Sequence, residues 1–395
     1  MRSMSSLDWW KGTGLRAEMR MDLKKEPLYL KIYNDLLLDI KEGIYPAGSR
    51  LPSEKELSEQ YQVSRITSKK ALEMLAEGNM ITRMPGKGSY VLGTGEDARE
   101  DKEAEAAGYG RRLLGVVLDS FGTAFGGNLL AGIERECRRA GFYPVLRCTY
   151  GSMEEESRAI RELITLGVSG LLLMCAQGEV YNETVLRLFV EKFPIVLVDR
   201  ELKGLPIPFV GTDNYRAAKE LTEILLSRGH TRNCFLSHPV MRTSSVKARF
   251  NGFRDCHLEH SLLTNESLWI TDIGSMLPTP DENEVAEYED VKKIENFVKE
   301  HPEVTGFFAV DHTIGVMVYK ILKRLGLERE KEIVFFDGLD EANDSNPVFT
   351  HVMQGEFLMG VRAVKCLRDW IEGKEVAETT YIPYRIVQGN REQQK

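Results

Sequence analysis

The spacing of apolar residues changes from helical to strand-like about a quarter of the way along the chain. Up to residue 77, apolar residues recur every three or four positions, which predicts amphipathic helices. The first of these spans residues 28–42 and is ended by Gly43. Its inward face is predicted to consist of Leu30, Tyr33, Leu37 and Ile40.

Two shorter helices and a hairpin are predicted next. Ser53 and Glu56 have the spacing of a capping box, so a second helix should start here and end near residue 61. Ser64 caps a third helix, and a two-stranded hairpin follows at residues 81–92. The apolar stripe of the third helix is predicted to contain Ala71, Leu72, Leu75 and Ala76.

After residue 110, short β-rich runs alternate with amphipathic segments, which predicts parallel sheets with helices on both faces. The pattern restarts after Gly229, so we expect two lobes with a ligand cleft beyond the carboxyl ends of their strands. The predicted strands are 113–118, 143–147, 171–175, 195–198, 234–237, 268–270, 306–310 and 333–336. The predicted helices lie near 126–140, 153–167, 181–192, 245–259, 285–300 and 312–325.

The chain therefore divides into an N-terminal winged helix-turn-helix at residues 25–93 and a two-lobed α/β sensor domain at residues 111–390. Residues 94–110 hold almost no bulky apolar side chain and are rich in acids, which is typical of a solvated linker. Residues 1–24 are predicted to be an N-terminal extension.

Composition narrows the classes of function. The 395 residues carry a formal net charge of −8, so any nucleic-acid site must be local. Apolar runs are far shorter than the roughly 20 residues that span a bilayer. The first twenty residues also lack a signal-peptide core, so we expect a cytoplasmic protein with no membrane partner. Six cysteines without a CxxC pair are typical of free buried thiols.

A basic face on the third helix is the first candidate for chemistry. Arg65 and Lys69 lie four residues apart and share a face, with Thr67 and Ser68 beside them. Short donors and long cations at the start of such a helix suit recognition of the DNA major groove. The hairpin tip, Pro85-Gly86-Lys87-Gly88, has few bulky side chains and can approach a phosphate backbone closely.

These motifs resemble the GntR family of bacterial regulators. The resemblance rests on Leu51-Pro52-Ser53-Glu54-Lys55-Glu56-Leu57, Val63-Ser64-Arg65, Ala71-Leu72 and Gly86-Lys87-Gly88-Ser89-Tyr90-Val91. It implies DNA contacts at Lys55, Arg65, Lys69 and the wing tip at Gly86. Ser68-Lys69 departs from the family's usual β-branched residue and Arg. Because lysine lacks the arginine fork, Lys69 is expected to contact phosphate rather than guanine.

The full set predicted to contact operator DNA is Ser53, Lys55, Ser64, Arg65, Thr67, Ser68, Lys69, Arg83, Gly86, Lys87 and Gly88. A winged helix that serves only as a protein-interaction module is the alternative. The combination of capping box, basic helix and Gly-Lys-Gly tip favours DNA.

A second set of polar residues follows the strands of the larger domain. Phe125 lies in the loop after the first strand, and Arg249 lies near the start of a helix. Arg200, Asp311 and Asp337 each come at or after the end of a strand. Asp and Arg bind sugar hydroxyls and an aromatic ring covers a sugar face, so these five residues are the predicted effector site. A surface ion pair for Arg200 and a turn cap for Asp337 are the alternatives that the sequence leaves open.

This region resembles the LacI-type sensor, which is related to periplasmic sugar-binding proteins. The resemblance rests on Leu114-Gly115-Val116-Val117, Val196-Leu197-Val198-Asp199-Arg200, Gly211-Thr212-Asp213-Asn214, Arg228-Gly229-His230, Arg249 with Gly252-Phe253, Val310-Asp311 and Phe336-Asp337-Gly338. It implies a periplasmic-binding-protein-like fold with effector contacts at Arg249, Asp311 and Arg200. Val310 departs from the family, which often has Asn before the Asp. Arg385-Ile386-Val387 replaces the family's usual ending. A GntR-type head on a LacI-type sensor is similar to arabinose-responsive repressors, which makes a pentose such as L-arabinose one candidate effector.

Together these features predict a DNA-binding regulator, acting as a repressor, that binds a palindromic operator as a homodimer and is controlled by a monosaccharide or related small molecule. A sugar-binding protein, or an enzyme of small-molecule metabolism with a vestigial head, is the alternative. No GxSxG, HExxH or GxxxxGK[ST] motif is present, so no catalytic residue or cofactor is predicted. His257 and His260 have no third ligand nearby in sequence, so a solvated face is expected there rather than a metal site.

Overall fold

The computed structural model describes residues 28–42, 44–45, 48–78, 80–84, 88–92, 112–122, 125–176, 181–239, 243–274, 284–338 and 349–389. The chain divides into two compact units, Met1–Thr94 and Gly95–Lys395. The predicted extension at residues 1–24 and the predicted linker at residues 94–110 lie outside the described residues.

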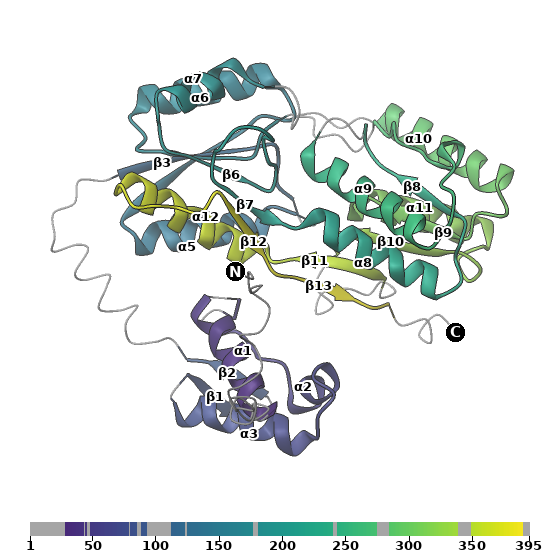
Figure 1. Ribbon diagram of the computed structural model, residues 1–395, viewed down its shortest axis with the longest axis horizontal. Helices are drawn as coiled ribbons and strands as arrows, with labels where there is room; N and C mark the ends of the chain where they lie inside the picture. The colour runs from purple at the N-terminus through teal and green to yellow at the C-terminus, as the bar shows by residue number, and fades with distance from the viewer. Residues whose placement is uncertain are drawn as a thin grey trace, which may run out of the picture. The chain divides into compact units, whose positions relative to one another are not determined.

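The first unit is a three-helix domain with a two-stranded wing (Figure 1). Its elements are α1 (Leu28–Glu42), α2 (Glu54–Gln60), α3 (Arg65–Glu77), β1 (Ile81–Met84) and β2 (Gly88–Val91). β1 and β2 pair antiparallel, and Arg50 forms a β-bridge with Tyr90, so the chain before α2 lies beside the wing. The predicted order of helix, helix-turn-helix and hairpin is confirmed.

The buried face of α1 differs from the predicted one. Ile40 is buried as predicted, but Ile32 and Leu36 are the other buried residues, and Tyr33 and Leu37 are only partly buried. Leu30, which was assigned to the inward face, also stays partly exposed. α1 is apolar over more than one face, so its packing partner α3 decides which face turns inward, and local spacing cannot. Ala71, Leu72 and Leu75 of α3 are buried as predicted.

The second unit begins with a six-stranded parallel sheet in the order β12-β7-β6-β5-β3-β4. Its strands are β3 (Arg112–Leu118), β4 (Phe142–Cys148), β5 (Leu171–Leu173), β6 (Ile195–Val198), β7 (Phe209–Thr212) and β12 (Thr379–Ile382). One face is covered by α5 (Gly127–Arg139) and α12 (Glu356–Ile371), and the other by α6 (Met153–Leu166) and α7 (Glu183–Val190) (Figure 1).

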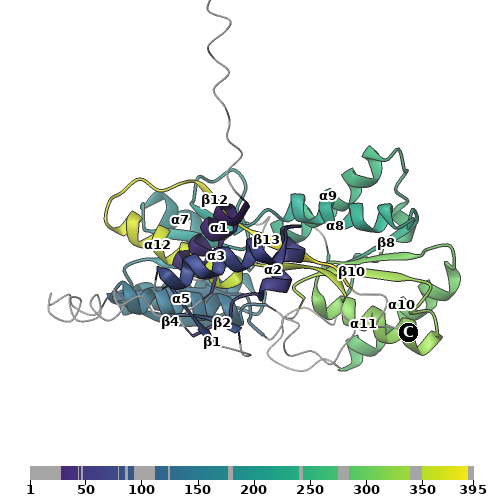
Figure 2. The same ribbon diagram turned by 90° about the horizontal axis from the view of Figure 1, so that it is seen from below.

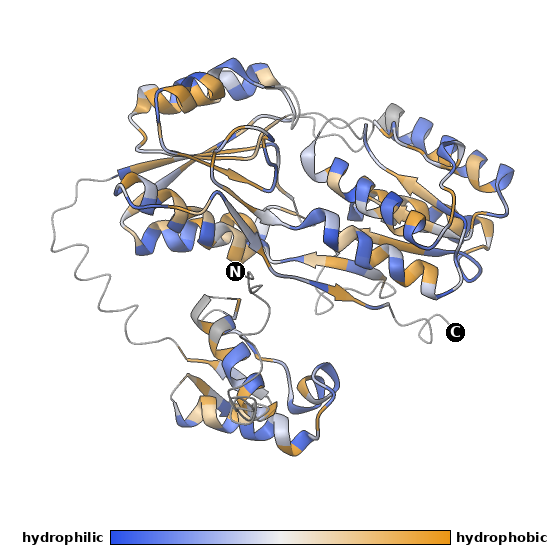
Figure 3. Ribbon diagram, viewed as in Figure 1, coloured by the Kyte–Doolittle hydropathy of each residue, from blue (hydrophilic) through white to orange (hydrophobic). Residues whose placement is uncertain are grey.

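The second sheet of this unit has five strands in the order β13-β11-β10-β9-β8, with β13 antiparallel to β11. Its strands are β8 (Asn233–Leu236), β9 (Gly306–Ala309), β10 (Glu332–Phe336), β11 (Thr350–Gln354) and β13 (Tyr384–Val387). α8 (Asn214–Ser227) and α9 (Ser244–Glu259) lie on one face, and α10 (Glu284–Glu300) and α11 (His312–Leu325) on the other (Figure 2). The strands are mostly apolar and the helices carry the polar residues (Figure 3), as expected for sheets buried on both faces.

The chain passes between the two sheets after β7, after β11 and after β12. Two of these crossings lie very close together, because a Cβ on Gly355 would stand 2.7 Å from the carbonyl oxygen of Pro383. Glycine is therefore required where the lobes join. The predicted α/β fold class with two lobes is confirmed. Within the described residues, no helix is both long and apolar enough to cross a membrane.

Sequence reasoning missed the elements that complete the two sheets. β7, α8, β11, α12, β12 and β13 were not predicted. The strand predicted at residues 268–270 is instead a 3-10 turn, η2 (Glu266–Leu268), followed by a single bridge from Ile270 to Leu236. Because this segment forms only a single β-bridge with β8, it lies beside that edge strand but does not add a sixth strand to the sheet.

Candidate DNA-binding face and ligand cleft

The start of α3 is fixed by its capping residue. The Oγ of Ser64 accepts a hydrogen bond from the Thr67 backbone N–H (3.3 Å) and lies 2.9 Å from Thr67 Oγ1. This cap leaves Arg65 and Ile66 as the first side chains of the helix, and both are exposed. Ile66 is 79% exposed and was missed from the sequence. Ile66 lies outside the buried apolar stripe of α3, and an apolar residue on the exposed side of the helix was the signal that could have identified it.

The cations around α3 differ in how they are engaged. Lys69 pairs with Glu73 (3.6 Å) and Lys55 with Glu59 (3.8 Å), both on exposed helix surface. Within the described residues, Arg65 has no ion-pair partner. Because exposed pairs of this kind contribute only about 0–1 kcal/mol, the lysines can exchange their carboxylates for phosphates. Arg65 needs no such exchange.

Two residues predicted to contact DNA are engaged inside the domain. Ser68 is fully buried, and its Oγ donates to the carbonyl oxygen of Glu54 (2.7 Å), joining α3 to α2. The prediction that Ser68 contacts DNA is wrong, because its hydroxyl has no access to solvent. Arg83 forms ion pairs with both Glu54 and Glu73 and so connects the wing to α2 and α3.

The remaining predicted contacts lie at the cap of α2 and in the wing. Ser53 caps α2, as the sequence predicts, by accepting from the Glu56 N–H. Gly86 and Lys87 lie outside the described residues. Gly88 has a φ of +113°, and a Cβ there would stand 2.9 Å from Nε of Arg50. The positive φ favours glycine at this position, while the Arg50 side chain could move aside, and the contact of Gly88 with DNA stays a prediction.

In the second unit, a cavity of about 370 Å³ lies between the carboxyl ends of the two sheets. All five predicted effector residues line it: Phe125, Arg200, Arg249, Asp311 and Asp337. Its volume is within the usual range for a small-molecule site. Eleven further lining residues that carry polar or aromatic groups were not among the predicted effector residues: Asp119, Ser120, Phe121, Tyr150, Asp199, His238, Thr243, Ser245, His312, Thr313 and Gln354.

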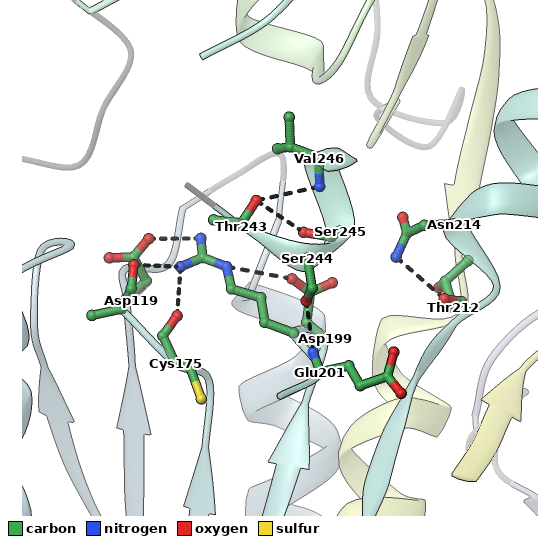
Figure 4. A network of polar contacts seen from close by, with 12 residues as sticks. Asp119, Cys175, Asp199, Glu201, Thr212, Asn214, Thr243, Ser244, Ser245 and Val246 are labelled. Carbon is green, nitrogen blue, oxygen red and sulfur yellow. Dashed lines mark hydrogen bonds and ion pairs between the residues drawn. The ribbon is translucent and has the colours of Figure 1, made fainter. Parts of the chain in front are cut away.

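Arg200 lies at the centre of a polar network on the six-stranded side. Its partners Asp119 and Cys175 are labelled in Figure 4. Its Nη2 donates to Oδ2 of Asp119 (2.7 Å), and its Nη1 donates to the carbonyl oxygen of Cys175 (2.8 Å). Arg200 therefore forms an ion pair, as one of the two sequence interpretations proposed, but the pair is buried and forms part of the cavity wall. Nearby, the backbone N–H of Glu201 donates to Oγ of Ser244 (2.8 Å), which links β6 to the start of α9 across the cleft.

Arg249 organises the five-stranded side. Its Nε donates to Oδ1 of Asn214 (2.7 Å) and its Nη1 to the carbonyl oxygen of Val310 (2.7 Å). The guanidinium stacks on the ring of Phe336, 3.9 Å from its centroid, and lies 3.5 Å from Asp337. Its Nη2 has no hydrogen-bond partner among the described residues, which leaves donors for a ligand.

Two aspartates occupy equivalent positions in the two lobes. Asp199 after β6 and Asp337 after β10 both adopt left-handed backbone conformations, with φ values of +63° and +65°. Such conformations are uncommon outside glycine and cluster at functional sites. Burial raises the pKa of Asp199, and burial also raises the pKa of Asp337 to about 6 despite the neighbouring Arg249.

Several polar atoms in the cavity wall have no protein partner. Within the described residues, Oδ1 of Asp119, Oδ1 of Asp199 and Oε1 of Gln354 are buried without a hydrogen bond. An unsatisfied buried acceptor costs about 1–3 kcal/mol, and a ligand that donates to it removes that cost. Nε of Arg200, a donor in the same wall, also lacks a hydrogen bond, so the cavity suits a ligand that both donates and accepts, as a hydroxyl group does.

His238 and Asp311 form a second pair in the wall, with Nε2 of His238 lying 2.9 Å from Oδ2 of Asp311. Burial lowers the pKa of His238, but the hydrogen bond and charge of Asp311 outweigh it and leave that pKa raised. The other carboxylate oxygen of Asp311 accepts from the Ile314 N–H and caps α11. Asp311 is thus held rigidly by both of its oxygens.

Comparisons with known families account for both units. The profile described as periplasmic binding proteins and sugar binding domain of LacI family matches residues 111–390. The chain belongs to this family. A second profile, bacterial regulatory proteins of the gntR family, matches residues 28–91. The chain thus joins a GntR-type DNA-binding region to a LacI-type sensor domain.

Relatives of similar length are transcription regulators. The arabinose metabolism transcriptional repressor of Geobacillus stearothermophilus is 23% identical over 372 residues, which cover 92% of this chain and 97% of that protein. The HTH-type transcriptional regulator KdgR of Bacillus subtilis is 27% identical over 274 residues, covering 68% of this chain and 76% of its own length. The relatives indicate a regulator and no catalytic family.

A solved structure supports the fold of the LacI-type domain. The transcription regulator GntR from Chromobacterium violaceum superposes with a TM-score of 0.61 at 22% identity, covering 71% of this chain and 100% of that one. At this identity the likeness establishes the fold alone.

Proposed function

We propose that this protein is a bacterial transcriptional repressor whose binding to operator DNA is controlled by an uncharged monosaccharide held in the cleft. The observation that carries the proposal is the cavity of about 370 Å³, walled by Asp and Arg side chains from both lobes, on the same chain as a GntR-type winged helix. The names of its full-length relatives, arabinose metabolism repressors, support a sugar.

The charges of the wall favour an uncharged ligand over an acidic one. Four carboxylates, those of Asp119, Asp199, Asp311 and Asp337, face two arginines, Arg200 and Arg249. Arg200 is already paired with Asp119 and Arg249 lies beside Asp337, so neither guanidinium is left to neutralise an added anion. Hydroxyl groups of a sugar can donate to the unsatisfied oxygens of Asp119 and Asp199, and Phe121 or Phe125 can cover the apolar face of the ring.

On the DNA side, Arg65, Ile66, Lys69 and Lys55 form the proposed reading face, with the wing close to the phosphates. We infer that the LacI-type domains pair two such heads in a homodimer on a palindromic operator. A protein that binds operator DNA would act in the bacterial cytoplasm. Ligand binding draws the lobes together and changes the DNA affinity through the connection between the units, with a coupling of about 1–3 kcal/mol.

The test is fluorescence anisotropy of labelled operator DNA with the full-length protein. L-arabinose and other neutral pentoses and hexoses are compared with sugar acids, sugar phosphates and glucosamine. A neutral sugar should shift the operator affinity about tenfold or more, and the sugar acids and sugar phosphates should not. If no sugar of any charge shifts the affinity or raises the melting temperature, the sensing role fails. If only an anionic sugar does so, the charge argument fails while the regulator assignment stands.

A further inference from the structure

α8 and α9 pack closely against each other, side by side and parallel. A Cβ on Gly252 of α9 would stand 2.3 Å from the carbonyl oxygen of Tyr215 on α8, so the backbones nearly touch. One polar contact per turn joins the exposed edges of the pair. Tyr215 bonds to Asp255 (3.2 Å), and Lys219 pairs with Glu259 (2.7 Å) one turn later.

One turn further along α8, the contact between the two helices involves a carboxylate, a thiol and an imidazole. Oε2 of Glu223 lies 2.7 Å from Nε2 of His260 and 3.6 Å from Sγ of Cys256. Within the described residues, this is a compact group of one oxygen, one nitrogen and one sulfur atom, all within 4.8 Å of one another. Glu223 and His260 are exposed and Cys256 is buried, so the group is open to solvent on one side only.

We propose that Glu223, Cys256 and His260 form a binding site for a thiophilic divalent cation, Zn²⁺, that connects α8 to α9. Thiolate, imidazole and carboxylate are the three kinds of side chain that bind zinc in proteins. Cys256 and His260 are four residues apart, which places both on one side of the end of α9. A water molecule would take the fourth position on the open side.

The spacing of the three atoms fits tetrahedral coordination. With Zn–S about 2.3 Å, Zn–O about 2.0 Å and Zn–N about 2.0–2.1 Å, a tetrahedral ion holds sulfur and oxygen about 3.5 Å apart, and nitrogen and oxygen about 3.3 Å apart. The Cys256–Glu223 separation of 3.6 Å already matches. The His260–Glu223 separation of 2.7 Å is shorter than this and must widen by about 0.6 Å, which the two exposed side chains allow.

Binding would replace one proton by the metal ion. In the metal-free protein the Cys256 thiol donates a hydrogen bond to Oε2 of Glu223. Zn²⁺ forms the S–Zn bond as the S–H bond breaks, and the proton leaves to solvent. In the metal-free contact Nε2 of His260 faces a carboxylate oxygen of Glu223 and so carries a hydrogen. For Nε2 to supply its lone pair to Zn²⁺, the neutral ring exchanges tautomer and carries its single proton on Nδ1 instead, so the thiol proton is the only one released.

His257, the other histidine considered from the sequence, takes no part. It is buried, its Nε2 lies 2.9 Å from Nδ2 of Asn233, and its Nδ1 lies 2.8 Å from the carbonyl oxygen of Phe253. The expectation that His257 and His260 share a solvated face is therefore wrong. His260 lies beside Cys256 of α9 and Glu223 of α8, and the contact with Glu223 cannot be predicted from the pattern along α9.

Co²⁺ titration of the reduced, metal-free full-length protein tests the proposal. A tetrahedral site with a thiolate ligand should give a stoichiometric sulfur-to-cobalt charge-transfer band, which Zn²⁺ then removes. Cys256→Ser should abolish the band. Glu223→Gln and His260→Gln, which change exposed side chains, should each weaken Co²⁺ binding at least roughly tenfold. Cys366→Ser on α12 and His301→Gln near the end of α10 are the matched controls and should bind as wild type does.

Because Cys256 is buried, Cys256→Ser could lose the band through misfolding, so the melting temperature is measured as a second readout on the variants of the exposed residues. Zn²⁺ should raise the melting temperature of the wild type and both controls, but not of Glu223→Gln or His260→Gln. The proposal is overturned if the wild type gives no stoichiometric band, or if the band survives in the three site variants. Because operator binding and sugar response are measured separately, a negative result here leaves the proposed function untouched.

Discussion

The DNA-reading face and the ligand cleft are assembled in different ways. The face of α3 that carries Arg65, Ile66 and Lys69 lies within five consecutive residues, whose direction is fixed by one capping serine. The cleft draws its walls from residues between Asp119 and Gln354, on two separate sheets. A helix surface is decided by local geometry, whereas a cleft exists only when distant strand ends meet.

The same difference appears in how the charges are held. The cations of α3 are exposed, and their ion pairs are weak and replaceable. The arginines of the cleft are buried, with their hydrogen bonds directed to carboxylates and carbonyl groups. Substitutions should therefore act on the two functions separately, and the expected effects below are ordered from the largest to the smallest.

Arg65→Ala should weaken operator binding by roughly a hundredfold or more, because a charged contact in the groove is worth about 1–3 kcal/mol and its phosphate attraction is also lost. Anisotropy measures the DNA affinity, and calorimetry measures the effector affinity, which should not change. Loss of both would mean that the two units are not independent.

Arg249→Ala should have the opposite effect. The effector response should fall by roughly a hundredfold, since the variant removes ligand donors and leaves Asp337 as an uncompensated buried charge. Operator affinity without effector should stay within about twofold of wild type. Arg249→Lys keeps the positive charge but lacks the planar set of guanidinium donors. If these donors bind the effector, this variant should fold normally and still bind the effector poorly, which distinguishes loss of the donors from misfolding.

Asp337→Asn should stabilise the sensor domain and weaken effector binding. The pKa of Asp337 is raised to about 6, so the folded state holds its proton more tightly than the unfolded state, and stability falls as pH rises through this range. The variant should be more stable than wild type by about 3 kcal/mol at pH 8, and most of this advantage should be lost by pH 4. Thermal unfolding at both pH values measures it. A less stable variant at pH 8 would show that Asp337 gains more from Arg249 than burial costs.

Ile66→Ala should weaken operator binding about fivefold, the loss expected for about 1 kcal/mol of apolar contact with a thymine methyl group. The same measurement on operators with deoxyuridine in place of single thymines identifies the contacted base. Removing that methyl group should weaken wild type but leave Ile66→Ala unchanged. If every such substitution affects both proteins equally, Ile66 does not read thymine.

Much of the molecule could be predicted from local pattern. The Ser53 capping box, the start of α3 at Ser64 and the wing were all predicted from short segments, because caps and hairpins depend on neighbouring residues. The strand ends that carry Arg200, Asp311 and Asp337 were predicted for the same reason, since a buried strand has a sequence pattern of its own.

The errors occur where partners are distant in sequence. The inward face of α1 depends on α3, and the burial of Ser68 depends on the Glu54 carbonyl group. Gln354 was missed because its strand β11 was not predicted, so nothing in its local sequence shows that it lines the cavity. The Glu223, Cys256 and His260 group was missed because its members come from two helices.

The sequence by itself determined the two units, the basic start of the recognition helix and the order of strands and helices, because these follow from apolar spacing and capping residues. Only the tertiary structure decided which side chains meet. Arg200 became a buried ion pair with Asp119, Arg249 came to lie beside Asp337, and Glu223 reached Cys256 and His260. Each meeting depends on the packing of elements that are separated by tens of residues, and a pattern read along one segment carries no information about that packing.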